Sequence, residues 1–199
     1  MSFARCGSLT TMGTLIYGMN VSVDGYIAAD NDDIGWSDPD EELHRYWNNH
    51  AQEIKLSLYG RKLYELMAAH WPTADQQPDV SPVEAEFARI WQATPRVVFS
   101  STLTSVDHNS RLERGDVVSV TKELKAGTDG LLEVGGATLA APLVRAGLVD
   151  EYRLVVHPAA VGSGTPFFPE VAKHVRLRLA ESRTFSSGVV LLRYEAVRD

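Results

Sequence analysis

The stretch LLEVGGATLAAPL, residues 131–143, places two adjacent glycines between an apolar strand-like run and a helix-like run of small residues. The pair suits a tight strand-to-helix turn, because glycine adopts the positive φ that other residues avoid. It also suits an anion site, because the first N–H groups of a helix are free to donate and lie at the positive end of its dipole. Alone, the double glycine leaves both interpretations open.

Around this stretch, strand-like and helix-like segments alternate. The runs expected as strands cover residues 14–20, 54–59, 96–99, 116–120 and 131–134. Apolar residues at helical spacing predict helices over about 38–54, 61–69, 82–93 and up to Ala146. Alternation of this kind predicts an α/β fold with a mostly parallel central sheet and helices on both faces. Residues 150–158, 176–185 and 188–197 are strand-like, and we expect them to add an antiparallel edge.

Several helix ends carry recognisable signals. Asp38 is the expected N-cap of the first helix, with Pro39 at its first position and Glu41 three residues after the cap. The segment from Ser81 repeats this arrangement. Pro142 lies inside the helix that follows the double glycine, where it removes a backbone hydrogen bond and is expected to produce a kink.

Composition excludes several classes of function. The chain has 199 residues, of which 44% are hydrophobic, which suits one domain with a substantial core. A net charge of −7 argues against a nucleic-acid-binding or anionic-membrane surface. The single cysteine and the spacing of the six histidines predict no metal site. No secretory or membrane-spanning segment is evident, so we expect a cytoplasmic protein, with residues 1–11 as a frayed leader.

Three predicted strand ends carry groups suited to a phosphate or a ribose. In a parallel sheet the carboxyl ends of the strands meet at one edge, where helix N-termini also point. Arg61 and Lys62 place two cations at a predicted helix start, which is unfavourable for the helix dipole unless an anion lies there. The three ends are Gly60-Arg61-Lys62, Ser100-Ser101-Thr102 and Gly135-Gly136-Ala137-Thr138. Their coincidence favours a dinucleotide site, although the usual GxGxxG motif is absent.

The order of these motifs resembles the dihydrofolate reductase superfamily, most closely the reductase domain of bacterial riboflavin biosynthesis. The resemblance covers nearly the whole chain from Met12 onward. It rests on VDGYIA (23–28), YGRKLYE (59–65), VVFSST (97–102), EVGGATL (133–139) and LVDEYRLVVHPAAVGSGTPFF (148–168).

The resemblance implies a three-layer dihydrofolate reductase-like domain over residues 12–199. It implies hydride transfer from NADPH to a planar heterocycle, either a pterin or a ribosylaminopyrimidine. The implied cofactor-binding residues are Val23, Gly25, Ile27, Gly60, Arg61, Lys62, Ser100, Ser101, Thr102, Val134, Gly135, Gly136, Ala137 and Thr138. Because no arginine adjoins Ser101, preference for NADPH over NADH would depend on Arg61 and Lys62.

The catalytic and substrate-binding residues are also taken from the resemblance. Trp36, Pro39 and Glu41 keep the spacing of a tryptophan, proline and carboxylate that grip the pterin in dihydrofolate reductase. Glu41 is equally well placed as a helix-capping residue, so both roles stay open. Asp24 is the second candidate catalytic carboxylate. Trp36, Glu41 and Thr165 are the candidate substrate contacts.

Two wider questions remain open at this stage. The alternative function is a non-catalytic nucleotide-binding or sensory module on the same fold. A homodimer formed through the apolar C-terminal strands is expected from the riboflavin-type resemblance. No residue discriminates a pterin from a ribosylaminopyrimidine.

Overall fold

One eight-stranded sheet organises the computed structural model, which describes residues 12–168 and 174–198. The predicted leader, residues 1–11, lies outside the described residues. The strands in their order across the sheet are β5 (Ser110–Glu113), β4 (Arg96–Phe99), β3 (Ile54–Gly60), β6 (Leu131–Gly135), β1 (Thr14–Ser22), β7 (Glu151–His157), β10 (Val190–Ala196) and β9 (Leu177–Thr184). A two-stranded sheet pairs β2 (Tyr26–Ala28) with β8 (Thr165–Pro166).

The first six strands of this order are parallel to one another, from β5 to β7. β10 runs antiparallel to both β7 and β9, which places an antiparallel hairpin at one edge. The prediction of a mostly parallel sheet with an antiparallel C-terminal edge is therefore confirmed. The antiparallel edge is smaller than predicted, because the segment 150–158 forms β7, which pairs in parallel with β1.

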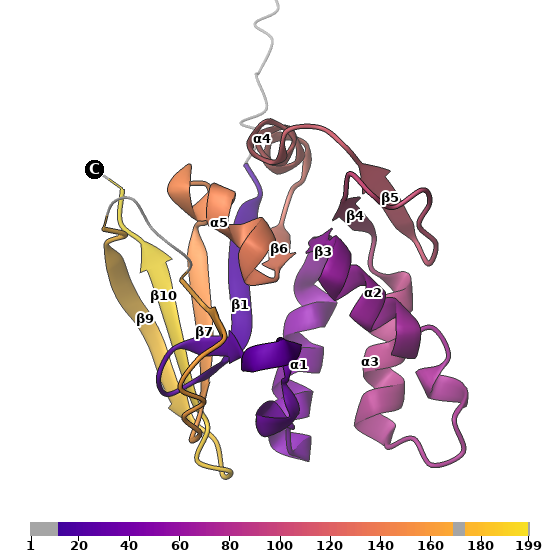
Figure 1. Ribbon diagram of the computed structural model, residues 1–199, viewed down its shortest axis with the longest axis vertical. Coiled ribbons are helices and arrows are strands. Elements are labelled where there is room, and N and C mark those ends of the chain that lie inside the picture. Colours follow the sequence, from indigo (N-terminus) through magenta and orange to yellow (C-terminus); the bar gives the residue numbers. More distant parts are fainter. Residues whose placement is uncertain (1–11, 169–173, 199) are drawn as a thin grey trace, which may run out of the picture.

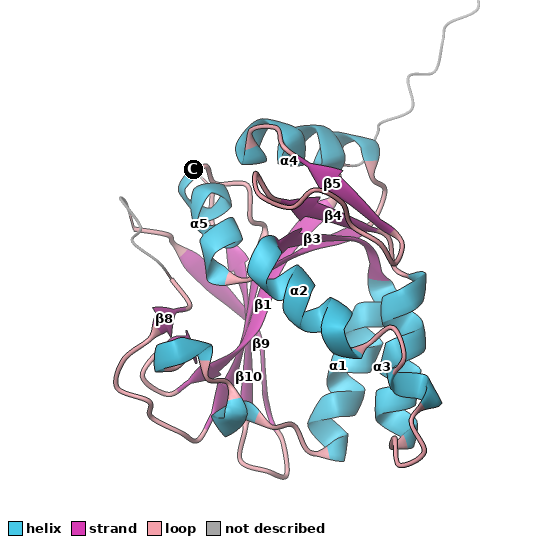
Figure 2. Ribbon diagram, turned by 45° about the vertical axis from the view of Figure 1, so that its right-hand side comes forward, coloured by secondary structure: helices cyan, strands magenta, loops and turns pink. Residues whose placement is uncertain are grey.

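Helices cover both faces of the sheet (Figures 1 and 2). On one face, α4 (Val117–Gly127) and α5 (Ala137–Arg145) pack over the largest apolar cluster, which includes Leu15, Leu58 and Val134. On the other face lie α1 (Glu41–Glu53), α2 (Arg61–His70) and α3 (Pro82–Ala93). Single-turn helices occupy Asp30–Asp32, Gly35–Ser37 and Ala74–Gln76. The fold is the predicted three-layer arrangement.

The start of α1 differs from the prediction. Asp40, and not Asp38, is the N-cap, because its side chain accepts a hydrogen bond from the Leu43 N–H at 2.8 Å. Asp38 and Pro39 precede the helix, and Glu41 is its first residue. The capping arrangement predicted for α3 is confirmed, since Ser81 and Glu84 form a reciprocal capping box.

The segment 116–120 was wrongly predicted as a strand. Asp116 caps α4 by accepting a hydrogen bond from the Ser119 N–H at 2.8 Å, and the following valines lie in the first turns of that helix. A mainly polar strand, β5, lies just before it and was not predicted. In α5 the helix runs through Pro142 to Arg145, and the carbonyl of Pro142 accepts from the Ala146 N–H at 3.0 Å.

Within the described residues, no helix is both long and apolar enough to cross a membrane. Nor do three or more His, Cys, Asp or Glu residues in that part of the chain gather in a way that could hold a metal ion.

Candidate functional site

Two helices begin on glycine at the carboxyl edge of the parallel strands. Gly60 is the N-cap of α2 and Gly136 is the N-cap of α5, and neither helix has a side-chain cap. By contrast, α1, α3 and α4 are all capped by a side chain. The first N–H groups of α2 and α5 are therefore left for another acceptor, and the helix dipole favours an anion there.

The two uncapped helix starts lie side by side. A Cβ built on Gly60 would be 3.7 Å from the Cβ of Leu139 in α5, and one on Gly135 would be only 2.2 Å from Leu63 in α2. Gly136 has a φ of +87° and open space where a side chain would be. The predicted turn is thus present at Gly136, and Gly135 in addition allows the close packing of α2 against the end of β6.

Positive side chains accompany this edge. Arg61 pairs with Glu65 at 3.2 Å, and Lys62 pairs with Asp32 at 3.0 Å. Both pairs are exposed, and exposed ion pairs contribute little to stability. Breaking these two ion pairs would therefore cost little free energy if Arg61 and Lys62 bound a phosphate instead.

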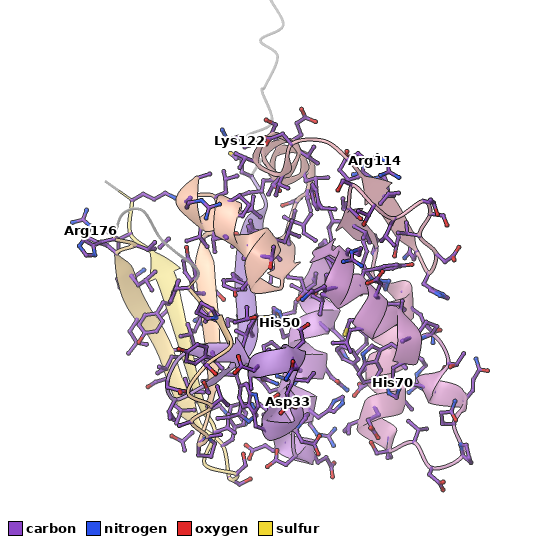
Figure 3. All side chains as sticks on the ribbon, in the orientation of Figure 1. Asp33, His50, His70, Arg114, Lys122 and Arg176 are labelled. Atoms are coloured by element: carbon purple, nitrogen blue, oxygen red, sulfur yellow. The ribbon has the colours of Figure 1, made fainter. Side chains whose placement is uncertain are left out.

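The loop after β4 forms a compact turn at the same edge. The Ser100 hydroxyl accepts hydrogen bonds from the N–H groups of Thr102 and Leu103, at 3.2 and 3.0 Å. Arg114 reaches this loop from beyond β5 and donates to the carbonyls of Ser100 and Leu103. Figure 3 places Arg114 at the periphery, beside β5. The fold thus brings an arginine that is distant in the sequence to this turn.

The turn between β1 and β2 is held by Asp24. Its carboxylate accepts from the Ser22 hydroxyl at 2.6 Å and from the backbone N–H groups of Val161 and Gly162. The Ser22 hydroxyl, followed by these backbone groups, lowers the pKa of Asp24 below its ordinary value. Asp24 is therefore an ionised anchor that joins this turn to the glycine loop after β7. Val23 is exposed beside it.

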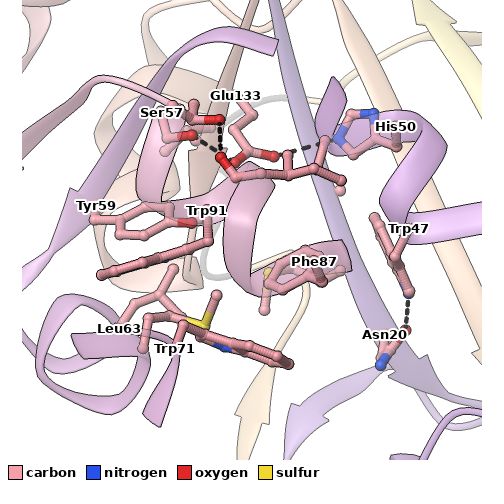
Figure 4. A pocket seen from close by; sticks show the side chains of 18 of the residues that line it. Asn20, Trp47, His50, Ser57, Tyr59, Leu63, Trp71, Phe87, Trp91 and Glu133 are labelled. Atoms are coloured by element: carbon pink, nitrogen blue, oxygen red, sulfur yellow. Dashed lines mark hydrogen bonds and ion pairs between the residues drawn. The ribbon is translucent and has the colours of Figure 1, made fainter. Parts of the chain in front are cut away.

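Next to the glycine edge lies a mainly apolar cavity of about 290 Å³. Leu63 in the first turn of α2 and Gly135 beside the N-cap of α5 line it, together with Ile27 and Val134. Its aromatic walls come from four separate segments and comprise Trp47, Tyr59, Trp71, Phe87 and Trp91 (Figure 4). Apolar and aromatic walls with few polar groups are typical of small-molecule sites.

Polar side chains form the floor of this cavity. Glu133 accepts hydrogen bonds from the Ser57 hydroxyl at 2.7 Å and from His50 Nε2 at 3.2 Å (Figure 4). Burial by itself would raise the pKa of Glu133, but the hydrogen bonds from His50 and Ser57 and the nearby charge of Arg96 outweigh it and lower the pKa. The floor therefore carries an ionised carboxylate.

Comparison with known proteins decides the family. Residues 13–191 match the family described as the RibD C-terminal domain. The chain belongs to this family. The uncharacterized protein YyaP of Bacillus subtilis (strain 168) is 33% identical over 184 residues, which make up 90% of this chain and 93% of that protein.

Solved structures share the fold of this RibD-type domain. Dihydrofolate reductase from Enterococcus faecalis, complexed with NADP(H), matches with a TM-score of 0.63 at 14% identity, over 94% of this chain and 98% of that one. A deaminase/5-amino-6-(5-phosphoribosylamino)uracil reductase from Thermotoga maritima matches with a TM-score of 0.65 at 15% identity, over 94% of this chain and 57% of that one. The chain therefore has a reductase fold, as the resemblance implied.

The predicted substrate and catalytic residues of the RibD-type domain do not line this cavity, although Glu41 lines a second pocket that shares Pro39, His44 and Trp71 with it. Glu41 is largely exposed and pairs with Arg45 at 2.6 Å, one turn further along α1. Trp36 donates to the Asp33 carbonyl at 3.2 Å and packs edge-on against His157. Thr165 pairs with Ala28 between β8 and β2. None of Glu41, Trp36, Thr165 and Asp24 is among the cavity-lining residues.

Sequence reasoning missed the polar floor and most of the aromatic walls. Trp47, for example, lines the cavity while its Nε1 donates to Asn20 at 3.1 Å. One signal was available. Strands buried on both faces read as continuous apolar runs, and Ser57 and Glu133 interrupt two such runs.

Proposed function

We propose that this RibD-type domain is an oxidoreductase that uses NADPH to reduce a planar heterocycle of pterin or ribosylaminopyrimidine type. One observation carries the proposal: the two uncapped, glycine-led starts of α2 and α5 lie side by side and adjoin an aromatic cavity. The pair of helix starts suits a pyrophosphate, and the aromatic cavity suits a flat ring.

The described residues fit such a cofactor. The free N–H groups at the starts of α2 and α5 would bind the pyrophosphate, with Gly60, Gly136, Ala137 and Thr138 at the centre of that site. Arg61 and Lys62 would neutralise phosphate charge, and the 2′-phosphate is assigned to Arg61. The hydroxyl-rich turn Ser100–Thr102 would take the adenosine end, beside Arg114.

When bound, a reduced nicotinamide supplies hydride. The protein then has to orient two rings and exclude water. Ile27, Val134 and Gly135 line the cavity, and the turn containing Val23 and Gly25 adjoins β2. Asp24 acts here as a positioning residue for that turn, because its carboxylate accepts hydrogen bonds from three donor groups of the protein. Glu41 pairs with Arg45 at 2.6 Å, and its proton-transfer role stays a prediction.

The test is a titration with NADPH and NADH followed by fluorescence, and then an assay of absorbance at 340 nm with dihydrofolate and with aminopyrimidine intermediates. Saturable NADPH binding with turnover of a heterocycle is the expected result. Binding without turnover of any heterocycle would favour the alternative, a non-catalytic nucleotide-binding or sensory module. Failure to bind either nucleotide would overturn the proposal.

Replacing Arg61 by alanine should weaken NADPH binding much more than NADH binding. The 2′-phosphate is present only in NADPH, and a hydrogen bond to a charged group contributes about 1.5–3 kcal/mol, roughly 10- to 100-fold in affinity. Parallel titrations of both nucleotides measure the ratio. Arg89→Ala, at an exposed position of α3, is the matched control and should change neither affinity by more than about two-fold. Equal losses for NADPH and NADH in Arg61→Ala would refute the assignment.

We also propose that the domain forms a homodimer through its C-terminal strands. β9 ends the sheet and so has an unpaired edge within the described residues. Leu179 on that strand is 51% exposed. A free edge and an exposed leucine are features that a second copy of the chain would cover.

A further inference from the structure

The second pocket, of about 560 Å³, is a polar extension of the mainly apolar aromatic cavity. Its walls come from the start of α1, the end of α2 and the start of α3. Pro39, His44 and Trp71 line both spaces, so a ligand that fills the aromatic cavity can extend past these side chains. The other residues that line the second pocket are Asp38, Asp40, Glu41, His70, Ser81, Pro82, Val83 and Glu84.

Carboxylates dominate the charge of the second pocket. Its walls contain four acidic residues and two histidines, and within the described part of the chain no lysine or arginine lines it. The hydroxyl and the backbone N–H of Ser81 lower the pKa of Glu84 below its ordinary value, so this carboxylate is ionised. A cleft lined by one sign of charge concentrates ions of the opposite sign and repels ions of the same sign. The second pocket therefore disfavours an anionic group.

The helix starts at this pocket do not offset its negative charge. Asp40 caps α1 by accepting from the Leu43 N–H at 2.8 Å, and Ser81 caps α3 by accepting from the Glu84 N–H at 3.3 Å. The starts of α2 and α5, by contrast, have no side-chain cap. The protein thus has one region that attracts an anion, at the starts of α2 and α5, and a separate pocket that attracts a cation.

The second pocket can also accept hydrogen bonds from an amine. The side-chain nitrogen of Asn48 donates to the Val83 carbonyl at 2.9 Å and to Glu86 at 2.7 Å. The side-chain oxygen of Asn48 therefore accepts from Nδ1 of His44, at 3.1 Å. In the neutral ring of His44, Nε2 is then an acceptor. Trp71 adds the attraction of an aromatic ring for a cation.

We propose that the second pocket selects the charge of the substituent that the substrate carries. The ring of the substrate lies in the aromatic cavity, and its substituent extends past Pro39, His44 and Trp71 and ends in a protonated amine. A carboxylate or a phosphate on this substituent would face the acidic walls and bind more weakly. The inference rests on the proposed function for its role in reduction, but charge selection can be measured without cofactor. It narrows the substrate class to planar heterocycles with a cationic side chain.

The first test compares three compounds that share the pterin ring and differ in charge. At neutral pH 6-(aminomethyl)pterin is a cation, 6-methylpterin is neutral and pterin-6-carboxylate is an anion. Fluorescence titration at low ionic strength should show binding about ten-fold or more tighter for the amine than for the carboxylate, with the neutral compound between them. The ratio should shrink in about 1 M salt, where the Debye length falls to about 3 Å. Equal affinities, the reverse order, or binding of none of the three would overturn the proposal.

The second test identifies the carboxylates. In the double variant Asp38→Asn with Glu41→Gln, the ratio of amine to carboxylate affinity should fall by about three-fold or more, because two charges leave the pocket wall. The control is the double variant Glu123→Gln with Asp129→Asn, which removes two charges at exposed positions in and after α4. It should leave the ratio within about two-fold. An unchanged ratio in the first variant, or equal changes in both, would overturn the assignment.

Titration of the unmodified protein with NADPH separates this inference from the proposed function. The residues that line the second pocket are not among those assigned to the cofactor. NADPH binding together with equal affinity for the three pterins would overturn the charge selection and leave the proposed function standing. Charge-selective binding of the pterins without NADPH binding would support the pocket assignment and overturn the proposed function alone.

Discussion

Two glycines in the loop after β7 differ in the physical reason why glycine is required there. A Cβ on Gly164, which has a φ of +132°, would lie 2.1 Å from the backbone oxygen of Ala28. Gly162 has a φ of +80° and open space around it. Its N–H donates to Asp24 at 2.7 Å. Gly164 therefore permits the close approach of β8 to β2, whereas Gly162 is needed for its backbone conformation alone.

The variant Gly164→Ala should be clearly less stable than Gly162→Ala. Both place an alanine at positive φ, which costs roughly 1–2 kcal/mol. Only Gly164→Ala adds a clash with backbone, for which overpacking typically costs a further 1–3 kcal/mol or so. Urea unfolding of the two variants against the unmodified protein measures the difference. Equal destabilisation would show that the close approach to Ala28 contributes nothing.

At the scale of elements, the N-cap of α1 lies two residues later than its sequence signal. Asp38 with Pro39 forms a familiar helix start, yet Asp40 makes the capping hydrogen bond. Replacing Asp40 by alanine should therefore lower the free energy of unfolding by about 1 kcal/mol. Asp38→Ala is the matched control and should change it by less than about 0.5 kcal/mol. Denaturant titration distinguishes them, and the reverse order of effects would restore Asp38 as the cap.

A second contact joins α1 to the turn between β9 and β10. The Glu42 carboxylate accepts from the Ser186 N–H at 2.9 Å, from the Ser186 hydroxyl at 2.8 Å and from Arg183 at 2.7 Å. Hydrogen bonds from the backbone and then the hydroxyl of Ser186, together with Arg183, lower the pKa of Glu42 to about 2. The ionised Glu42 carboxylate therefore holds α1 against the C-terminal hairpin.

This contact predicts a pH dependence of stability. The pKa of Glu42 is lower in the folded protein than its ordinary value of 4.5, so its contribution is complete above about pH 5 and is lost as the pH falls toward 2. Glu42→Gln should therefore be less stable than the unmodified protein at pH 7, and the difference should shrink on acidification. Thermal unfolding across this range measures it. A difference independent of pH would mean that ionisation of Glu42 is not involved.

At the scale of the whole molecule, a chain of ion pairs crosses the sheet to the cavity. Arg193 on β10 bonds both Glu181 on β9 and Glu151 on β7, and Glu151 bonds Arg153 on β7. Arg153 then reaches His50 over β1, where its register partner is Gly18. A side chain at position 18 would contact Arg153 and Trp47, so glycine at this position leaves room for Arg153 to reach His50 across β1. The antiparallel edge and the cavity floor are thereby connected.

The proposed homodimer gives a prediction at the same scale. Leu179→Glu should shift the protein toward monomer in light scattering coupled to gel filtration, because it places a charge on the free edge of β9. Leu66→Glu, at a similarly exposed position of α2, is the matched control and should leave the molar mass unchanged. A monomeric unmodified protein, or equal effects of both substitutions, would count against a dimer through β9.

Sequence alone determined those features that depend on local periodicity and backbone chemistry. Alternating strand-like and helix-like runs predicted the layered α/β fold, and glycine at the starts of α2 and α5 marked the helix ends that lack side-chain caps. The parallel sheet then required these ends to lie at one edge. The valine-rich segment 116–120 was one of the departures, because β-branched residues resemble a strand until the cap at Asp116 is considered.

Tertiary structure decided which residues line the cavity. Glu133, Ser57 and Arg96 become neighbours only through strand register, and the aromatic walls come from segments distant in the chain. The place of Arg114 at the Ser100 turn likewise depends on the path of the chain through β5. Periodicity reports which face of an element is buried, but it does not report which residues on neighbouring elements meet there. That pairing is set by register and packing across the whole sheet.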